Sequence, residues 1–316
     1  MEIKVSVIVP FWKVEAFIAR CASSLMEQTL QEVEFIFVDD ASPDRSAEIL
    51  REAVAGSGRD VKILSHPVNK GLPAARNTGL SAALGKYVFH CDSDDYLEPA
   101  MLEKLYLAAE AARADIAYCD FWLDFGDTRR LMPARGFGDA ATMLREGFLA
   151  GTLKYNVWNK LARRSLYEGI SFPEGHSMGE DMTMMMLASR AGAVVHVAEP
   201  LYHYMKTNDG ALTTGFSDKA LEDLRFNTDR VLEFLGPLDG DWAEFFKLNV
   251  KLPFLFTGEK RDWRNWRSWY PEANRFIGRN KALPFRTRMV QHFAALGLRP
   301  LVQAYCFLVS KLLYRR

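Results

Sequence analysis

Two groups of carboxylates follow short apolar segments of this chain of 316 residues. Asp39 and Asp40 come directly after VEFIFV (33–38), and the DSDD segment (92–95) comes directly after KYVFHC (86–91). The three carboxylates of DSDD repel one another unless a cation or solvent screens them. Hard oxygen ligands without a neighbouring Cys or clustered His favour Mg²⁺ or Mn²⁺, which one or two carboxylates usually hold together with substrate phosphates and water. The DSDD segment therefore predicts a divalent metal site.

Both groups also have a structural interpretation. DSDD precedes a predicted helix start near Pro99, and acidic residues are common at such starts. Asp39 and Asp40 open DDASPD, which suits a turn and a helix N-cap. The chain contains neither GxGxxG nor GxxxxGKS/T, which excludes the usual dinucleotide and P-loop motifs. A phosphate bound here is expected to be held mainly by the metal and by side chains.

The elements that must position these groups alternate along the first 120 residues. Apolar, β-branched runs predict strands at 3–9, 33–38, 61–65, 86–91 and 115–119. Helical spacing of apolar residues predicts helices at 15–28, 44–55, 73–83 and 99–112. This alternation predicts an α/β fold with a mainly parallel, Rossmann-like sheet and helices on both faces. Ligands of such sheets collect beyond the carboxyl ends of the strands, so Pro10 and Trp12 are expected at the same rim as both carboxylate groups.

The rest of the chain is less regular. A helix is predicted at 181–191 and a strand at 194–197, and from about residue 216 onward the pattern is helical. We therefore place a domain boundary near residue 215, with a helical C-terminal region at 216–316.

Composition limits the class of protein. The chain is 49% hydrophobic and 25% charged, which allows a full core and excludes a fibre, a disulfide scaffold and a disordered tail. Four cysteines, far apart in the sequence, show neither metal-ligand nor disulfide spacing, so we expect a reducing, cytoplasmic compartment. The apolar run at the N-terminus is too short for a signal peptide, and no stretch of about 18 apolar residues predicts a membrane-spanning helix.

The charge is distributed unevenly although it sums to zero. Residues 258–316 have 13 basic and 3 acidic residues, a net charge of +10, and residues 1–257 have 27 and 37, a net charge of −10. The basic region also has Trp263, Trp266, Trp269 and Tyr270 at helical spacing. Such helices can lie on an anionic membrane surface. A packed helical subdomain and a homodimer face are the alternatives, and no nucleic-acid motif accompanies the charge.

Several sequence blocks occur in the order and spacing of a known family. The chain resembles the family 2 glycosyltransferases, which are inverting enzymes of the GT-A fold, and in its second half the bacterial capsule and O-antigen sugar transferases. The resemblance covers roughly residues 1–215 and rests on VSVIVPFWKVEAFIARCASSLMEQTL (5–30), VDDASPD (38–44), NKGLPAARNTGL (69–80), DSDDYLEP (92–99), VWNKLARRSLY (157–167), ISFPEG (170–175), MGEDMTM (178–184) and PLYHYMKTNDGALT (200–213).

The resemblance implies a role for each donor-site residue. Residues 1–120 would form the nucleotide-sugar-binding half and residues 121–215 the acceptor half of the catalytic domain. Asp39 would accept the imide N–H of uracil, and Pro10 and Trp12 would pack along the base. Arg76 would lie near the diphosphate or the donor sugar. Asp92 would touch the ribose or sugar hydroxyls, Ser93 would belong to the same donor-binding set, and Asp94 would ligate the Mn²⁺ or Mg²⁺ that bridges the phosphates.

The same resemblance implies a catalytic base and an acceptor region. Asp181 of Gly179-Glu180-Asp181 would take the proton of the acceptor hydroxyl, with Glu180 as the neighbour most easily confused with it. Trp158, Lys160 and His203 would line or support the acceptor pocket, and the alternative for Trp158 and His203 is an ordinary core position.

These implications define an expected function. We expect the protein to transfer a single sugar from a UDP-sugar to a saccharide acceptor at the cytoplasmic face of the membrane. We also expect this acceptor to be linked to a lipid. The chain lacks the QxxRW signature of processive synthases, which favours single transfer. A nucleotidyltransferase and a non-catalytic sugar-nucleotide-binding protein are the alternatives. The first would need a Gly-rich basic loop after the first strand, where this chain has PFWKVEAF, and the second would lack the base.

Overall fold

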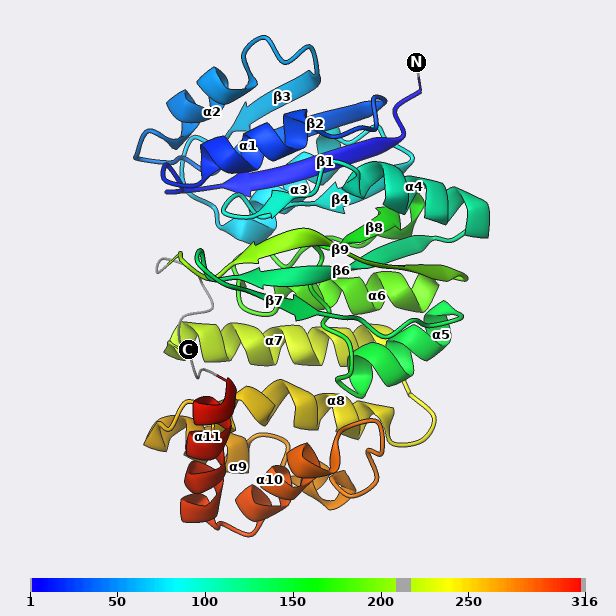
Figure 1. Ribbon diagram of the computed structural model, residues 1–316. Coiled ribbons are helices and arrows are strands. Elements are labelled where there is room, and N and C mark those ends of the chain that lie inside the picture. Colours follow the sequence, from blue (N-terminus) through cyan, green and yellow to red (C-terminus); the bar gives the residue numbers. More distant parts are fainter. Residues whose placement is uncertain (1, 209–216, 314–316) are drawn as a thin grey trace. The chain divides into compact units, whose positions relative to one another are not determined.

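The computed structural model describes residues 2–208 and 217–313 (Figure 1). They divide into two compact units, formed by residues 1–143 with 155–231 and by residues 144–154 with 232–316. The predicted boundary near residue 215, and the end of the 200–213 block, lie outside the described residues. The boundary between the two compact units lies instead within helix α7 (Asp218–Leu235), between Val231 and Leu232.

The first unit contains a mixed, mainly parallel sheet. Its described strands are β1 (Val5–Phe11), β2 (Val33–Asp39), β3 (Asp60–Ser65), β4 (Tyr87–His90), β5 (Tyr96–Leu97), β6 (Ile116–Asp124), β7 (Arg129–Met132), β8 (Lys160–Arg163) and β9 (Val194–Met205). Their order is β3-β2-β1-β4-β8-β6-β9-β5, and β7 pairs with β6 at the side. Strands β1 to β4 run parallel, and β8 lies antiparallel between β4 and β6. The predicted mainly parallel α/β sheet is confirmed.

Helices cover both faces of this sheet (Figure 1). The described helical segments of the first unit are α1 (Ile18–Met26), α2 (Ser46–Val54), α3 (Leu72–Ala82), α4 (Met101–Ala112), α5 (Ala140–Thr142), the 3₁₀ turns η2 (Arg164–Tyr167) and η3 (Glu180–Met182), α6 (Thr183–Arg190) and most of α7. Val5, Val7 and Val9 of β1 share a core cluster with residues of α1, α2 and α4. Ile8 points to the other face and packs against α3, as the alternation of side chains along a strand requires.

The sheet order places a topological switch point at the candidate site. Strand β1 has β2 on one side and β4 on the other, and the chain continues from β2 to the outer strand β3 before it returns to β4. The strand order reverses direction at this point, and ligands of open α/β sheets bind there, beyond the carboxyl ends of the strands. Trp12, Asp39 and Asp92 all lie just at or after these ends.

The second unit is helical, as the sequence predicts for the C-terminal region. Its described segments are the π-helical turn η1 (Met143–Leu149), the end of α7, α8 (Trp242–Lys251), η5 (Leu252–Leu255), α9 (Lys260–Ser268), η6 (Pro271–Phe276), α10 (Phe285–Ala295) and α11 (Arg299–Leu313). Trp266 is fully buried in this unit, and the ammonium of Lys251 lies 4.6 Å from the centre of its ring. Trp266 is therefore a core residue and cannot be one of the rings predicted for a membrane surface. No helix in the described ranges combines the length and the hydropathy needed to cross a membrane.

Candidate active site

The buried guanidinium of Arg76 joins the two halves of the predicted site. Its Nη2 donates to Asp92 at 2.9 Å, and its Nη1 donates to Asp181 at 2.5 Å and to Glu180 at 3.2 Å. The side chain of Arg76 is 1% exposed, so these carboxylates surround it. The structure thus gives Arg76 the position of an organiser that holds the DSDD segment beside the Glu180-Asp181 turn.

Local packing fixes the helix that carries Arg76. The backbone N–H groups of Lys70 and Gly71, which lead into α3, donate to the carboxylate of Asp40 at 2.8 and 2.7 Å. Within α3, a Cβ on Gly79 would lie 2.4 Å from Cγ2 of Ile8, so only glycine allows the helix to approach β1 so closely. Asp40 therefore positions a loop across the sheet edge, a role that the turn interpretation of DDASPD does not identify.

The turn that carries Asp181 is held by α7. Asn227 donates to the backbone carbonyls of His176 and Met178 at 3.3 and 3.0 Å, and Asp223 accepts from the backbone N–H of Ser177 at 3.0 Å. Gly179 then takes a positive φ of 84°, which glycine adopts without the steric cost of a side chain. Asp181 follows in η3, a 3₁₀ turn before α6, where the sequence predicts the start of one continuous helix.

Burial and mutual repulsion give these carboxylates different proton affinities. Burial raises the pKa of Glu180 to about 8, with a further contribution from Asp181, while Arg76 opposes the shift. Burial also raises the pKa of Asp92 to about 6. Burial disfavours the charged form of Arg76, but Asp181, Asp92 and Glu180 raise its pKa above the ordinary value. The raised pKa favours the protonated form of Glu180 near neutral pH, which makes Asp181 the better candidate for a base.

The DSDD carboxylates have three separate environments. Asp95 is fully buried and accepts from the hydroxyl of Tyr202 at 2.7 Å and the backbone N–H of Met205 at 2.8 Å, so it is an anchor of the sheet. Asp92 is bound by Arg76. Asp94 accepts from Asn208 through Oδ2 at 2.8 Å, and its backbone carbonyl accepts from Arg20. Asp94 is thus the member of the group whose carboxylate has neither a cationic partner nor an anchoring role among the described contacts.

The donor set around Asp94 agrees with a cation held partly by substrate. No three His, Cys, Asp or Glu residues in the described part of the chain are placed to enclose a metal ion by themselves. Mg²⁺ and Mn²⁺ usually need only one or two protein carboxylates when phosphates and water complete the shell. Asp94, with its Oδ1 outside the contact to Asn208, satisfies that requirement.

The residues predicted for the nucleotide base lie at adjacent strand ends. Phe11 of β1 is in register with Asp39 of β2, and Trp12 follows directly with 45% of its surface exposed. Asp39 accepts from the backbone N–H of Ser42 through Oδ1 at 2.8 Å. Pro10 is buried in β1, and Ser93 is 7% exposed within the DSDD segment. The exposed indole of Trp12 and the carboxylate of Asp39 therefore lie at the carboxyl ends of the neighbouring strands β1 and β2.

Two predicted acceptor residues are packed in the interior. Trp158 is 6% exposed and stacks on Tyr202 and Tyr204, with ring centres 4.6 and 5.1 Å away. His203 is 1% exposed, with Nε2 2.8 Å from Glu98 and its ring stacked on Tyr96 at 4.1 Å. This packing corresponds to the core interpretation of both residues, and we assign no acceptor contact to either.

Lys160 is a buried basic residue whose amine is held by two asparagines. Its Nζ donates to the backbone carbonyl of Asn156 and to Oδ1 of Asn159, both at 2.8 Å. Burial lowers the pKa of Lys160 to about 7, although the negative charge of Asp181 acts in the opposite direction. The structure therefore places the predicted acceptor residue Lys160 in the interior, held by Asn156 and Asn159, and we assign it no acceptor contact.

The lowered pKa of Lys160 predicts a pH-dependent stability. Between pH 7 and its ordinary pKa of 10.5, the unfolded chain holds the proton while the folded chain has released it. Rising pH therefore stabilises the folded state, by at most about 1.4 kcal/mol per pH unit. In urea unfolding from pH 7 to 9, the free energy of unfolding of the wild type is expected to rise relative to that of Lys160→Met. A difference that stays constant over this range would contradict the assignment.

Two buried cysteines, Cys21 and Cys91, lie close together next to Asp92. The Sγ atoms of Cys21 and Cys91 are 3.9 Å apart, and Cys91 donates to the backbone carbonyl of Asp92. All four cysteines are free thiols. The sequence spacing gave no signal for this contact, because it depends on how α1 packs against β4.

Comparison with known proteins identifies relatives of this chain. The family model "Glycosyl transferase family 2" matches residues 6–184. An uncharacterized glycosyltransferase of Bacillus subtilis, EpsJ, is 38% identical over 221 residues, which cover 66% of this chain and 62% of EpsJ. The matched part thus spans less than two thirds of that relative.

Solved structures show the same fold at low sequence identity. S. aureus TarS 1–349, crystallised in complex with UDP-GlcNAc, is 20% identical with a TM-score of 0.70, and the match covers 96% of this chain and 91% of TarS 1–349. The mannosyltransferase PcManGT from Pyrobaculum calidifontis, in complex with GDP-Man and Mn²⁺, is 17% identical with a TM-score of 0.54, covering 99% and 88% of the two chains. With the family model matching more than half of its residues, this chain belongs to glycosyl transferase family 2.

Proposed function

We propose that this protein transfers a single sugar from a UDP-sugar to a saccharide acceptor, with inversion at the anomeric carbon, in the synthesis of a cell-surface polysaccharide. The observation that carries the proposal is the contact of Arg76 with both Asp92 and Asp181. It holds a candidate base beside the strand edge at which ligands of this fold bind. Family membership favours glycosyl transfer over nucleotidyl transfer and over simple binding.

We assign the nucleotide to the carboxyl ends of strands β1 and β2. Trp12 is 45% exposed, and its ring would offer a flat surface for uracil beside the Lys13 ammonium, which lies 4.5 Å from the ring centre. Pro10, in β1, would pack along the base as well. Asp39 has one carboxylate oxygen outside its contact with Ser42, and this oxygen would accept the imide N–H of uracil. TarS, a protein of the same fold, was crystallised in complex with UDP-GlcNAc, which supports a UDP-sugar as the donor class.

We assign a divalent cation to Asp94, with Ser93 and Asp92 at the hydroxyls of the ribose or sugar. The cation would act as a Lewis acid that neutralises the departing diphosphate. The GDP-Man and Mn²⁺ in PcManGT support a metal of this class. Within the chain, Arg20 and Asn208 fix the backbone and one carboxylate oxygen of Asp94, so its remaining oxygen is presented in a defined position.

We assign Asp181 as the general base. In the proposed step the acceptor hydroxyl oxygen attacks the anomeric carbon, the bond from that carbon to the phosphate oxygen breaks, and its electron pair leaves with UDP. The hydroxyl proton passes to Asp181, whose Oδ1 is bound to Arg76 and whose Oδ2 is the atom we assign to accept it. The bond from Arg76 orients the carboxylate, and the protonated Glu180 beside it limits the negative charge of the turn.

The metal assignment predicts the effect of removing the Asp94 carboxylate. Asp94→Ala is expected to abolish the Mn²⁺-dependent part of UDP-sugar binding while the fold stays intact. Calorimetric titration with a panel of UDP-sugars, with and without Mn²⁺, measures this effect. Asp127→Ala, which removes an exposed carboxylate, is the matched control and should bind like the wild type. Unchanged affinity of folded Asp94→Ala in Mn²⁺ would remove Asp94 from the metal site.

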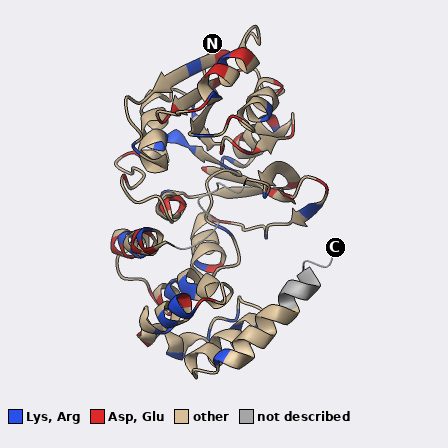
Figure 2. Cartoon of the chain, turned by 90° about the vertical axis from the view of Figure 1, so that its left-hand side faces the viewer, with Lys and Arg blue, Asp and Glu red and all other residues tan. Residues whose placement is uncertain are grey.

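We further propose that the second unit holds the enzyme on an anionic membrane surface, at the cytoplasmic face where a lipid-linked acceptor lies. Its described surface exposes several large apolar side chains, namely Phe256, Phe285, Leu296, Leu298, Leu301, Phe307 and Leu308. Lys and Arg residues are spread over the helices of this unit (Figure 2), and residues 258–316 carry a net charge of +10. Exposed apolar groups among basic side chains complement an anionic lipid surface.

Liposome flotation tests the membrane proposal. Recovery with anionic liposomes is expected to exceed recovery with neutral ones and to fall at high salt, because each basic residue near the surface contributes about 1 kcal/mol that salt screens. Phe285→Ser combined with Leu296→Ser should reduce recovery severalfold, whereas Leu84→Ser, at a site in the first unit that is 63% exposed against 72% for Phe285 and Leu296, should not. Equal recovery on both lipids, or none, would point to a packed subdomain or a contact between two copies.

A further inference from the structure

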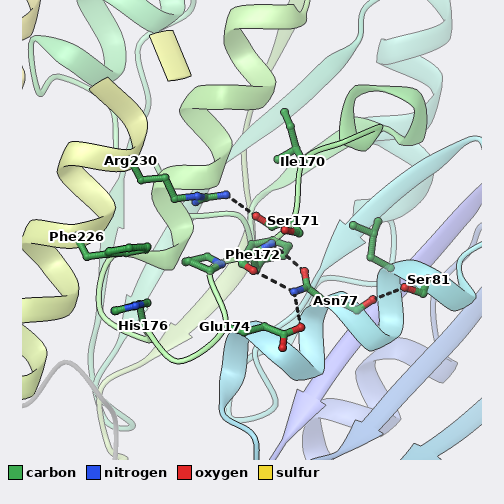
Figure 3. Close-up of a pocket in the computed structure, with 11 residues that line it drawn as sticks. Asn77, Ser81, Ile170, Ser171, Phe172, Glu174, His176, Phe226 and Arg230 are labelled. Atoms are coloured by element: carbon green, nitrogen blue, oxygen red, sulfur yellow. Dashed lines mark hydrogen bonds between the residues drawn. The ribbon is translucent and has the colours of Figure 1, made fainter. Parts of the chain in front are cut away.

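A cavity in the first unit lies outside the residues assigned to the donor, the metal and the base (Figure 3). Its volume is about 620 Å³, and it lies between α3, the loop 170–176 and α7. Its polar and aromatic lining residues include Asn77, Ser81, Glu174, His176, Phe226 and Arg230. We propose that this cavity is a saccharide-binding subsite that holds a non-reacting sugar of the acceptor. The acceptor role rests on the proposed function, whereas saccharide binding itself does not.

A fixed aromatic ring forms one wall. Phe226 is 43% exposed, and its ring stacks on that of His176 at 3.7 Å between centres with only 9° between the planes. His176 is itself held by Asp223 through Nδ1 at 3.0 Å. One face of the Phe226 ring is therefore covered and the ring is oriented, while a large part of it stays accessible. A pyranose has a C–H face that packs on such a ring and a rim of hydroxyls that needs polar partners.

The polar groups of the cavity suit a neutral polyhydroxyl ligand. Arg230 donates to Oγ1 of Thr183 at 3.2 Å and to the carbonyl of Ser171, and it has no ion pair among the residues that the structure describes. Glu174 accepts from Asn77 at 3.1 Å on the opposite wall. One cation and one anion thus face a cavity that is also part apolar. This combination disfavours a strongly charged ligand and an apolar one, and planar groups of both signs can donate to and accept from sugar hydroxyls.

The cavity is connected to the candidate active site through its walls. Phe172 lines the cavity, and its ring centre lies 5.4 Å from the guanidinium carbon of Arg76. Asn77 follows Arg76 in α3. Its Oδ1 accepts a hydrogen bond from the backbone N–H of Phe172 at 2.8 Å, and its Nδ2 donates to the backbone carbonyl of Phe172 at 3.0 Å. Arg230 contacts Thr183, two residues after Asp181. A ligand in the cavity therefore touches the residues that support the catalytic turn, without contacting the proposed catalytic groups themselves.

Saturation-transfer NMR tests the proposal directly. Lactose, cellobiose, maltose and N,N′-diacetylchitobiose serve as probes, without UDP-sugar or metal. At least one is expected to receive saturation from the wild-type protein, and Phe226→Ala should weaken its binding about tenfold. Phe234→Ala, on the same helix but outside the cavity, is the matched control and should bind like the wild type. Glu174→Gln, which keeps shape and removes charge at an exposed position, is the second variant and should also bind more weakly.

The outcomes separate this inference from the proposed function. Absence of binding of all four probes to the wild type would overturn the saccharide subsite, and so would binding to both cavity variants that is as strong as binding to the wild type. Failure of UDP-sugar binding would instead contradict the proposed function and leave the subsite intact. With an acceptor built on the bound disaccharide, Phe226→Ala should raise the acceptor KM about tenfold and change the donor KM less than twofold. An unchanged acceptor KM would show that the subsite does not serve the acceptor.

Discussion

Arg76→Met is expected to lower the free energy of unfolding by about 3–5 kcal/mol and to abolish transfer. The wild-type guanidinium is buried against Asp92, Glu180 and Asp181, and removal of one partner of a buried ion cluster leaves the other charges uncompensated. The two carboxylates that we assign to the donor and the base would then repel each other. Urea unfolding followed by far-UV circular dichroism measures the stability, and release of UDP measures the activity.

A surface ion pair provides the control for Arg76. Arg45 pairs with Glu48 at 2.9 Å, but both side chains are more than half exposed, at 66% and 56%. Such pairs contribute at most about 1 kcal/mol, so Arg45→Met should change neither stability nor transfer strongly. If Arg76→Met were as stable and active as Arg45→Met, the guanidinium would not be the organiser of the site.

Asp181→Asn is expected to reduce transfer by about 10²–10⁴, the usual contribution of a general base, while donor affinity changes only a few fold. The amide keeps the shape of the side chain and one oxygen for the bond from Arg76, but it cannot accept the proton. Calorimetric titration of the UDP-sugar and initial rates of UDP release measure the two effects separately. In Asp181→Asn, the rate of transfer should therefore fall strongly while the affinity for the UDP-sugar stays close to that of the wild type.

Glu180→Gln is the matched control for Asp181. Burial raises the pKa of Glu180 to about 8, so its carboxyl is already neutral near pH 7 and replacement by an amide changes little charge. We expect less than a tenfold loss of transfer. If Glu180→Gln loses as much activity as we expect for Asp181→Asn, and Asp181→Asn stays near wild type, the base is Glu180.

The strands at the centre of the sheet could be predicted from the sequence because they are short, apolar and buried. The predicted segments 33–38 and 61–65 agree within one residue with β2 and β3. Strand β9 continues to Met205, far beyond the predicted 194–197, because the sheet accommodates Pro200 at an irregular step in the pairing with β6. Strand β8 was missed because its four residues, KLAR, carry no apolar alternation.

The candidate site could be predicted as a set of residue types but not as an arrangement. The DSDD segment indicated a metal site that includes Asp92 and Asp94. The family resemblance implied Asp181 as the base and Arg76 near the diphosphate or the donor sugar. Only the fold shows that Arg76 is enclosed by carboxylates, since these contacts join segments far apart in the chain. The cavity beside Phe226 had no sequence signal, because α3, the loop 170–176 and α7 form it together.

The anomeric configuration of the product tests the central claim most directly. The protein is incubated with Mn²⁺, a disaccharide acceptor and each of UDP-glucose, UDP-galactose, UDP-N-acetylglucosamine and UDP-N-acetylgalactosamine, all of which are α-linked. Proton NMR then reads the coupling constant at the new glycosidic bond. The account predicts that one donor is consumed, that UDP is released and that the new bond is β. An α-linked product, or no consumption of any of the four donors, would contradict it.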